Sequence, residues 1–121
     1  MTEERQRREQ LGRDAEDRAA AYLEREGFSV VGRRVRTPAG EVDLIAYREP
    51  LLAFVEVKAR ASAGRGLHSL SPRQAARIAG AAEWFLAENP SYADAIVRFD
   101  LIVVVPGGEP RHFTDAWQAE V

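Results

Sequence analysis

Apolar side chains near the amino terminus recur every three or four residues, which is the spacing of one face of a helix. Gly27 stands where a left-handed residue would end such a helix, so the helix is predicted to run to about Glu26. The face predicted to be buried carries Leu11, Ala15, Ala19, Tyr22 and Leu23.

A second helix is predicted between two proline signals. Ser71 followed by Pro72 is typical of an N-cap and the first helical position, and Asn89 followed by Pro90 is typical of a helix end. The residues predicted to point inward are Ile78, Ala82, Phe85 and Leu86, with Trp84 also on the core side.

Five strands are predicted from valine-rich or alternating segments bounded by Gly, Pro and Asn. They are residues 28–36, 41–47, 51–59, 95–105 and 111–114. The first three are expected to form an antiparallel meander, and the intervening helix makes the fourth parallel to the third. The order α, β, β, β, α, β, β predicts an α/β (α+β) fold with a mixed central sheet flanked by helices. Residues 61–70 are small and glycine-containing without periodicity, which predicts a loop. The loop either closes over a substrate or simply connects the third strand to the second helix.

Two charged side chains interrupt the apolar strand 51–59, and a third stands in the strand before it. If the turn between these strands centres between Glu49 and Pro50, Asp43 lies opposite Glu56, and Lys58 follows on the same face. The other face is entirely apolar and carries Val42, Leu44, Ala46, Ala53, Val55 and Val57. The charges are therefore expected to meet at one end of a buried surface.

Carboxylates that face each other repel unless a cation lies between them. A hard divalent ion with oxygen ligands would resolve the repulsion between Asp43 and Glu56. The alternative is an ordinary ion pair between Glu56 and Lys58, with Asp43 capping a turn. The pattern alone leaves both possibilities open.

Composition narrows the class of protein. The 121 residues, 45% of them hydrophobic, suit one domain over residues 1–121 with its own core. Because the chain has no cysteine, it has no disulfide framework, thiolate metal site or cysteine nucleophile. The amino terminus lacks a signal-peptide pattern, and the β-like apolar run at residues 101–105 is too short to cross a membrane. A soluble, cytoplasmic protein is expected.

The charge is unevenly distributed along the chain, although its formal total is only −2. Residues 33–77 carry nine basic and four acidic side chains, whereas residues 78–121 carry two and seven. A basic middle section can attract a polyanion whatever the total charge. Lys58 is the only lysine, which favours a need for a compact ammonium at that position.

Five segments carry a resemblance to a known family. The strand segments read GEVDLIA, LAFVEVKAR and RFDLIVV, and the helical segments read LGRDAEDRAAAYLEREGF and ARIAGAAEWFL. Together they resemble the YraN family of small bacterial proteins. That family is similar to the PD-(D/E)xK nucleases and, most closely, to archaeal Holliday-junction resolvases. The resemblance covers nearly the whole chain and implies a restriction-endonuclease-like αβββαβ core.

The resemblance also implies a catalytic site. Such nucleases carry an aspartate on the second strand and an E-x-K motif on the third, which here are Asp43, Glu56 and Lys58. Glu16 matches an additional family glutamate, with an exposed helix face as the alternative. Asp43, Glu56, Glu16 and the carbonyl of Val57 would hold Mg²⁺ or Mn²⁺ for metal-dependent, endonuclease-like hydrolysis of a phosphodiester. Lys58 would orient the attacking water or offset charge on the phosphate.

Nucleic acid, DNA in particular, is the expected partner. Arg34 and Gln74 stand where relatives usually have asparagine and lysine, and the arginine favours a phosphate contact. Candidates for backbone contacts are Arg33, Arg34, Arg36, Arg60, Arg65, Arg73, Gln74 and Arg77, although each arginine taken alone is more typical of a solvated surface position. Branched DNA and a homodimer are expected by analogy with resolvases. The alternatives are a non-catalytic nucleic-acid-binding module and a protein-interaction scaffold.

The remaining polar candidates are assigned no catalytic role. His68 and His112 lack metal-ligand spacing and are predicted to have no role. Asp100 is expected to have a structural partner, such as Arg98 or a backbone amide.

Overall fold

The computed structural model describes residues 2–61 and 70–117, and its elements follow the predicted order. They are α1 (Glu3–Arg25), β1 (Ser29–Thr37), β2 (Gly40–Arg48), β3 (Leu51–Ala59), α3 (Pro72–Glu88), the 3₁₀ helix η2 (Pro90–Tyr92), β4 (Ile96–Val104) and β5 (Arg111–Phe113). The third strand has the predicted bounds, and the others differ by about one residue. Most of the predicted loop 61–70 lies outside the described residues. Within those residues, no helix has the length and apolar character needed to span a membrane.

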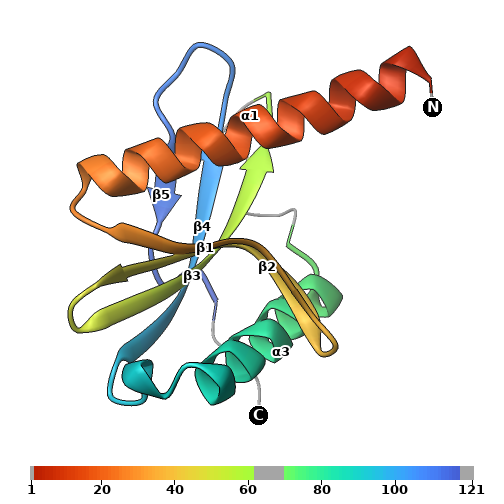
Figure 1. Cartoon of the computed structure of the whole chain (residues 1–121). Helices are drawn as coiled ribbons and strands as arrows, with labels where there is room; N and C mark the ends of the chain where they lie inside the picture. The colour runs from red at the N-terminus through yellow and green to blue at the C-terminus, as the bar shows by residue number, and fades with distance from the viewer. Residues whose placement is uncertain (1, 62–69, 118–121) are drawn as a thin grey trace.

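The five strands form one mixed sheet in the order β1-β2-β3-β4-β5 (Figure 1). β1, β2 and β3 form an antiparallel meander, β4 is parallel to β3, and β5 is antiparallel to β4. The predicted crossover between β3 and β4 contains α3. The α+β architecture is therefore confirmed, and it is consistent with a restriction-endonuclease-like core.

The two long helices cover opposite faces of the sheet (Figure 1). On the α1 side, Leu23, Leu44 and Ile102 are fully buried in one cluster. On the α3 side, the buried Phe54 packs edge-to-face on Phe85, with ring centroids 6.0 Å apart. Each fully buried side chain of this size contributes about 1.5–3 kcal/mol to folding. These two clusters bury both faces of the central strands.

The tip of the β1–β2 hairpin rests directly on α3 (Figure 1). A β-carbon on Gly40 would collide with the backbone carbonyl of Arg77, and one on Gly80 would collide with that of Ala39. Glycine at both positions permits this close approach. As a result, α3 fixes the direction of the first residues of β2.

β2 changes the face that it presents at Asp43. Leu44 packs on the α1 side, but Val42, predicted on the same face as Leu44, is buried in the α3 cluster. The first residues of β2 pair with β1, whereas pairing with β3 begins only at Leu44. The predicted alternation is therefore wrong at Val42, because the strand twists at the residue that carries the candidate carboxylate.

Two apolar residues predicted to face the core are exposed. Leu11 is 61% exposed and lines a shallow cavity together with Ala59 and Val104, the last residues of β3 and β4. Trp84 is 43% exposed, since the buried face of α3 is formed by Ile78, Ala81 and Ala82. Helical spacing is regular along both helices, but it does not show which part of each apolar stripe the sheet covers.

α3 begins in a capping box. The side-chain oxygen of Ser71 accepts the N–H of Gln74, and Gln74 Oε1 accepts the N–H of Ser71, both at 3.1 Å. The predicted N-cap is confirmed. Gln74, a predicted nucleic-acid contact, therefore has its side-chain oxygen engaged within the protein.

Ser71→Ala is expected to lower the free energy of unfolding by about 1 kcal/mol, because one end of the capping box is lost. Urea denaturation followed by circular dichroism measures the change. Ser91→Ala, at an exposed serine of η2, is the matched control. A loss for Ser71→Ala no larger than that of the control would contradict the capping role.

Candidate functional site

The sheet opens between β2 and β3 at Asp43. The two strands pair in the predicted register as far as Leu44 opposite Val55, and the pairing then stops. In place of a backbone partner, the N–H of Val57 donates to Asp43 Oδ2 at 2.8 Å. Because the N–H and C=O of one strand residue point toward the same neighbouring strand, the carbonyl of Val57 also faces this opening.

Glu56 and Lys58 lie on either side of Val57 and form an ion pair at the opening. Lys58 Nζ is 3.2 Å from Glu56 Oε2, and the side chains are only 13% and 12% exposed. Burial and the neighbouring Glu56 carboxyl group raise the pKa of Asp43 to about 8, against the opposing effects of the Val57 N–H and Lys58. Asp43 therefore binds a proton more readily than a free carboxyl group does, and additional positive charge would oppose this.

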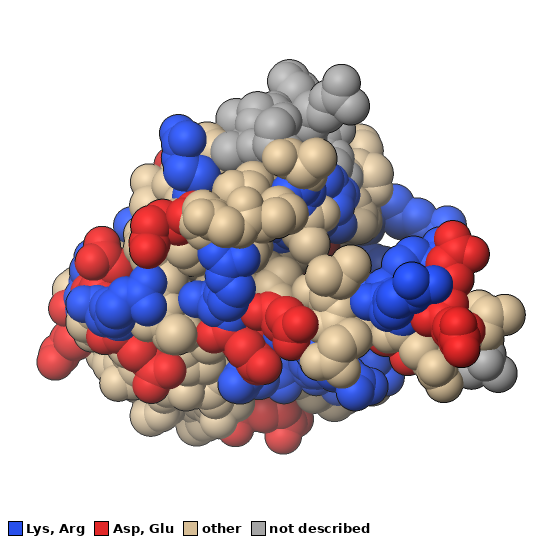
Figure 2. Space-filling view, turned by 90° about the horizontal axis from the view of Figure 1, so that it is seen from above, with Lys and Arg blue, Asp and Glu red and all other residues tan. Residues whose placement is uncertain are grey.

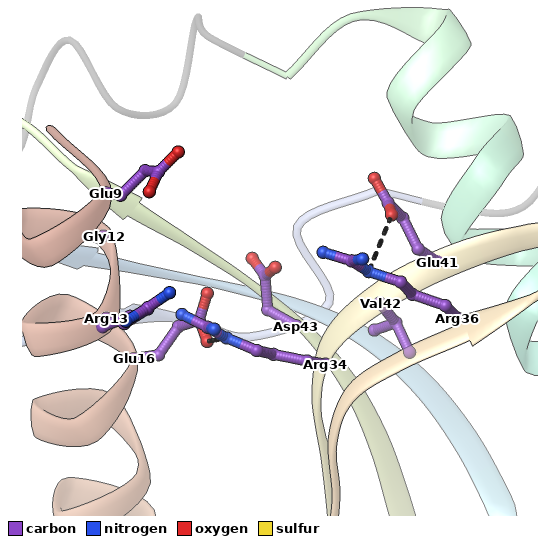
Figure 3. A pocket seen from close by; sticks show the side chains of 9 residues that line it. All are labelled: Glu9, Gly12, Arg13, Glu16, Arg34, Arg36, Glu41, Val42 and Asp43. Atoms are coloured by element: carbon purple, nitrogen blue, oxygen red, sulfur yellow. Dashed lines mark hydrogen bonds and ion pairs between the residues drawn. The ribbon is translucent and has the colours of Figure 1, made fainter. Parts of the chain in front are cut away.

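A cleft of about 360 Å³ lies beside Asp43, between α1 and the β1–β2 hairpin (Figure 3). Glu16 of α1 and Arg34 of β1 point toward each other across it, and Arg34 Nε donates to Glu16 Oε1 at 2.7 Å. Glu16 is 15% exposed. The helix thus brings a third carboxylate to the same side of the sheet as Asp43, but an arginine binds it there.

The groups at the opening that could bind a metal all do so through oxygen atoms. Asp43 and Glu56 supply carboxyl groups and Val57 supplies a carbonyl, a set that suits Mg²⁺ or Mn²⁺. Glu16, the fourth predicted ligand, is held by Arg34. Within residues 2–61 and 70–117, no three acidic or histidine side chains are grouped so as to hold a metal. The residues therefore fit a hard divalent ion in kind, and Glu16 would join them only after leaving Arg34.

The arginines predicted to contact nucleic acid on β1 are each paired with an acid. Arg33 pairs with Asp17 of α1, and Arg36 Nε lies 3.9 Å from Glu41. On the face shown in Figure 2, basic and acidic side chains are intermingled. The charges of the β1 arginines are thus compensated locally by neighbouring acids.

The other predicted contacts lie away from the cleft. Arg60 follows the end of β3, and its guanidinium donates to the carbonyl of Ala59 at 2.8 Å. Arg73 and Arg77 are exposed on α3. Arg65, together with His68, lies outside the described residues.

A buried polar network joins α1 to β4 and β5, and the sequence predicted only part of it. Asp100 is fully buried and accepts two hydrogen bonds from Arg98, at 2.8 and 2.7 Å, as predicted. His112, predicted to have no role, has Nε2 2.7 Å from Asp100 and Nδ1 3.0 Å from the Tyr22 hydroxyl. The sequence did not predict this structural role, in which His112 links Tyr22 of α1 to Asp100 of β4. Its position opposite Ile102 of β4 could have signalled that it shares a face with Asp100.

The fold and the site together define an α+β domain with a restriction-endonuclease-like core, an aspartate on β2 and a Glu-x-Lys pair on β3. A family model described as uncharacterised protein family UPF0102 matches residues 15–104. The chain belongs to this family, UPF0102, which is the YraN family. The family predicted from the sequence is therefore confirmed.

Several relatives are similar over most of their length. A UPF0102 protein of Rhodopseudomonas palustris strain BisB18 is 49% identical over 108 residues, which is 89% of this chain and 80% of that protein. One from Bradyrhizobium diazoefficiens is 46% identical over 108 residues, which is 89% of this chain and 81% of that protein. Another, from Granulibacter bethesdensis, is 46% identical over 109 residues, which is 90% of this chain and 69% of that protein.

Proposed function

We propose that this protein is a metal-dependent nuclease that hydrolyses phosphodiester bonds in nucleic acid, with branched DNA as the expected substrate class. The observation that supports the proposal most strongly is the opening of the sheet between β2 and β3. Two partly buried carboxyl groups, a backbone carbonyl and the only lysine of the chain meet there. A simple ion pair needs only Glu56 and Lys58, whereas Asp43 adds a carboxyl group that is costly to ionise. Groups of this kind are concentrated at functional sites.

The residues around the opening have distinct chemical roles in this proposal. Asp43, Glu56 and the carbonyl of Val57 would hold Mg²⁺ or Mn²⁺, and Glu16 would complete the set. When bound, such an ion lowers the pKa of an attacking water and withdraws charge from the phosphate. Lys58 donates hydrogen bonds to the oxygens on which negative charge develops. Glu56 fixes the position of that ammonium, 3.2 Å away.

The cleft beside Asp43 would receive the nucleic-acid backbone. Arg34 and Arg36 line it, and guanidinium groups recognise phosphate in a bidentate manner. Since both arginines are paired with protein carboxylates, phosphates must exchange with those carboxylates. Phosphate contacts to these arginines would release counterions from the nucleic acid, so binding should weaken as the salt concentration rises.

Glu56→Gln is expected to slow cleavage by at least about a hundredfold, because the amide binds a cation poorly and no longer holds Lys58 by charge. Labelled junction, flap and duplex DNA are incubated with purified protein in Mn²⁺, and initial rates are compared. Glu83→Gln, at an exposed position of α3, is the matched control and should cleave at the wild-type rate.

The same assay separates the alternatives. Equal cleavage by the wild type and Glu56→Gln would assign the activity to a contaminant and overturn the proposal. Absent cleavage with salt-sensitive DNA binding would favour a non-catalytic binding module. Absence of both cleavage and binding would favour a protein-interaction scaffold.

A further inference from the structure

We propose that Arg34 regulates the metal site as a built-in competitor. In the free protein its guanidinium holds Glu16 away from the metal-binding groups, and a backbone phosphate of the nucleic acid releases Glu16 by taking over the guanidinium. The inference rests on the proposed function and concerns control of the same site. It is carried by the position of Arg34, by its backbone conformation and by the burial of its partner.

Arg34 lies directly across the β1–β2 pair from Asp43. The ladder contains the pairs Arg33–Leu44 and Val35–Val42 and omits the position between them. At this position Arg34 has φ +49°, in the left-handed region that side chains other than glycine and asparagine rarely adopt. Such strained residues are concentrated at functional sites. The strain thus occurs at the β1 residue that faces a candidate ligand.

Glu16 is the residue on which this competition acts. Its carboxylate is 15% exposed, and its Oε1 lies 2.7 Å from Arg34 Nε. A short, charge-assisted hydrogen bond with one shielded partner is stronger than a fully exposed ion pair. Figure 3 shows the Arg34 side chain reaching from β1 to Glu16, with Asp43 beside the pair. A cation seeking Glu16 must therefore displace a guanidinium.

The adjacent ion pair provides a natural comparison. Arg33 pairs with Asp17, the residue after Glu16, but Asp17 is 65% exposed. Neither of these residues lines the cleft beside Asp43. Arg33 and Arg34 thus bind neighbouring acids of α1, and only the Arg34 pair lies next to the metal-binding groups.

Cooperative binding follows from the competition. Phosphate and Glu16 both bind the guanidinium, so a phosphate that takes Arg34 frees the carboxylate for a cation. Nucleic acid would then strengthen metal binding, and the metal would strengthen nucleic-acid binding by the same factor. The metal site is thereby completed only where a backbone phosphate is present.

Calorimetric titration with Mn²⁺ tests the inference without requiring cleavage. Arg34→Asn removes the guanidinium and retains the fold, because asparagine tolerates the left-handed conformation. This variant should bind Mn²⁺ about three- to tenfold more tightly than the wild type. Arg33→Asn, with the same charge change, should gain less than about twofold. A short DNA duplex should strengthen Mn²⁺ binding more in the wild type than in Arg34→Asn.

A double-mutant cycle identifies Glu16 as the source of the gain. Glu16→Gln should alter Mn²⁺ affinity by less than about threefold in the wild type and should remove the gain in Arg34→Asn. A gain that survives Glu16→Gln would assign the effect to charge alone and overturn the inference. Unchanged affinity in Arg34→Asn, with binding abolished in Asp43→Asn, would overturn it and leave the proposed metal site intact. Absent Mn²⁺ binding in both the wild type and Arg34→Asn would overturn both proposals.

Discussion

Asp43→Asn is expected to stabilise the metal-free protein by roughly 2–4 kcal/mol near pH 8, although it removes a proposed metal ligand. Burial and Glu56 raise the pKa of Asp43 to about 8, so ionising this group in the folded chain is costly. Four pKa units set an upper limit of about 6 kcal/mol, which solvent and local relaxation reduce. Asparagine keeps an oxygen for the N–H of Val57 and carries no charge.

The pH dependence gives this prediction its sign. The folded pKa is raised above the unfolded value of 3.8, so the folded chain binds the proton more tightly. Proton binding by Asp43 therefore contributes to the free energy of unfolding. This contribution is fully present below about pH 4 and is lost as the pH rises through about 8. Urea denaturation of the wild type and Asp43→Asn should therefore give curves that diverge progressively between these two pH values.

Two comparisons make this result specific. Asp94→Asn, at an exposed aspartate after η2, should show no such divergence. Saturating Mn²⁺ should raise the stability of the wild type and not that of Asp43→Asn, because only the wild type keeps the ligand. A variant less stable than the wild type near pH 8, or a difference independent of pH, would contradict the proposed electrostatic cost.

Much of the fold could be predicted because local signals and long-range packing agree in the central strands. The apolar runs in β3 and β4 and the capping signals of α3 gave correct elements, and the hairpin register gave the correct pairing up to Leu44. The errors occur where packing partners end. Leu11 lies at the last residues of β3 and β4, and Val42 follows β1 toward α3 after the ladder with β3 stops. No local pattern encodes where the neighbouring strands end.

The residues that form the candidate site could be predicted from the sequence, but the residues that bind them could be predicted less well. Spacing along β2 and β3 predicted that Asp43, Glu56 and Lys58 lie close together, because alternate residues of a strand point to the same face of the sheet. The Arg34–Glu16 pair could not be derived in this way, since it joins a left-handed strand residue to a helix. Such contacts depend on how α1 crosses the sheet.

The buried Asp100 network makes the opposite electrostatic contribution from that of Asp43. Burial alone would raise the pKa of Asp100, but hydrogen bonds from His112, Arg98 and the N–H of Asp115 lower it below its ordinary value. A lowered pKa means that stability is present above the unfolded pKa and is lost as the pH falls through the folded pKa. The chain therefore contains one aspartate that destabilises it as the pH rises and another that stabilises it except in acid.

Asp100→Asn is expected to lower the free energy of unfolding by about 3–5 kcal/mol at neutral pH, because it breaks a buried charge network. Oδ1 accepts from Arg98 and the N–H of Asp115, and Oδ2 accepts from Arg98 and lies 2.7 Å from His112. Either orientation of the amide therefore turns its NH₂ group toward a donor of Arg98.

Urea denaturation measures the loss of stability in Asp100→Asn, which should shrink below about pH 4. Tyr22→Phe, which removes one outer hydrogen bond, should cost about 1 kcal/mol. Equal losses in the two variants would contradict a central role for the Asp100 charge.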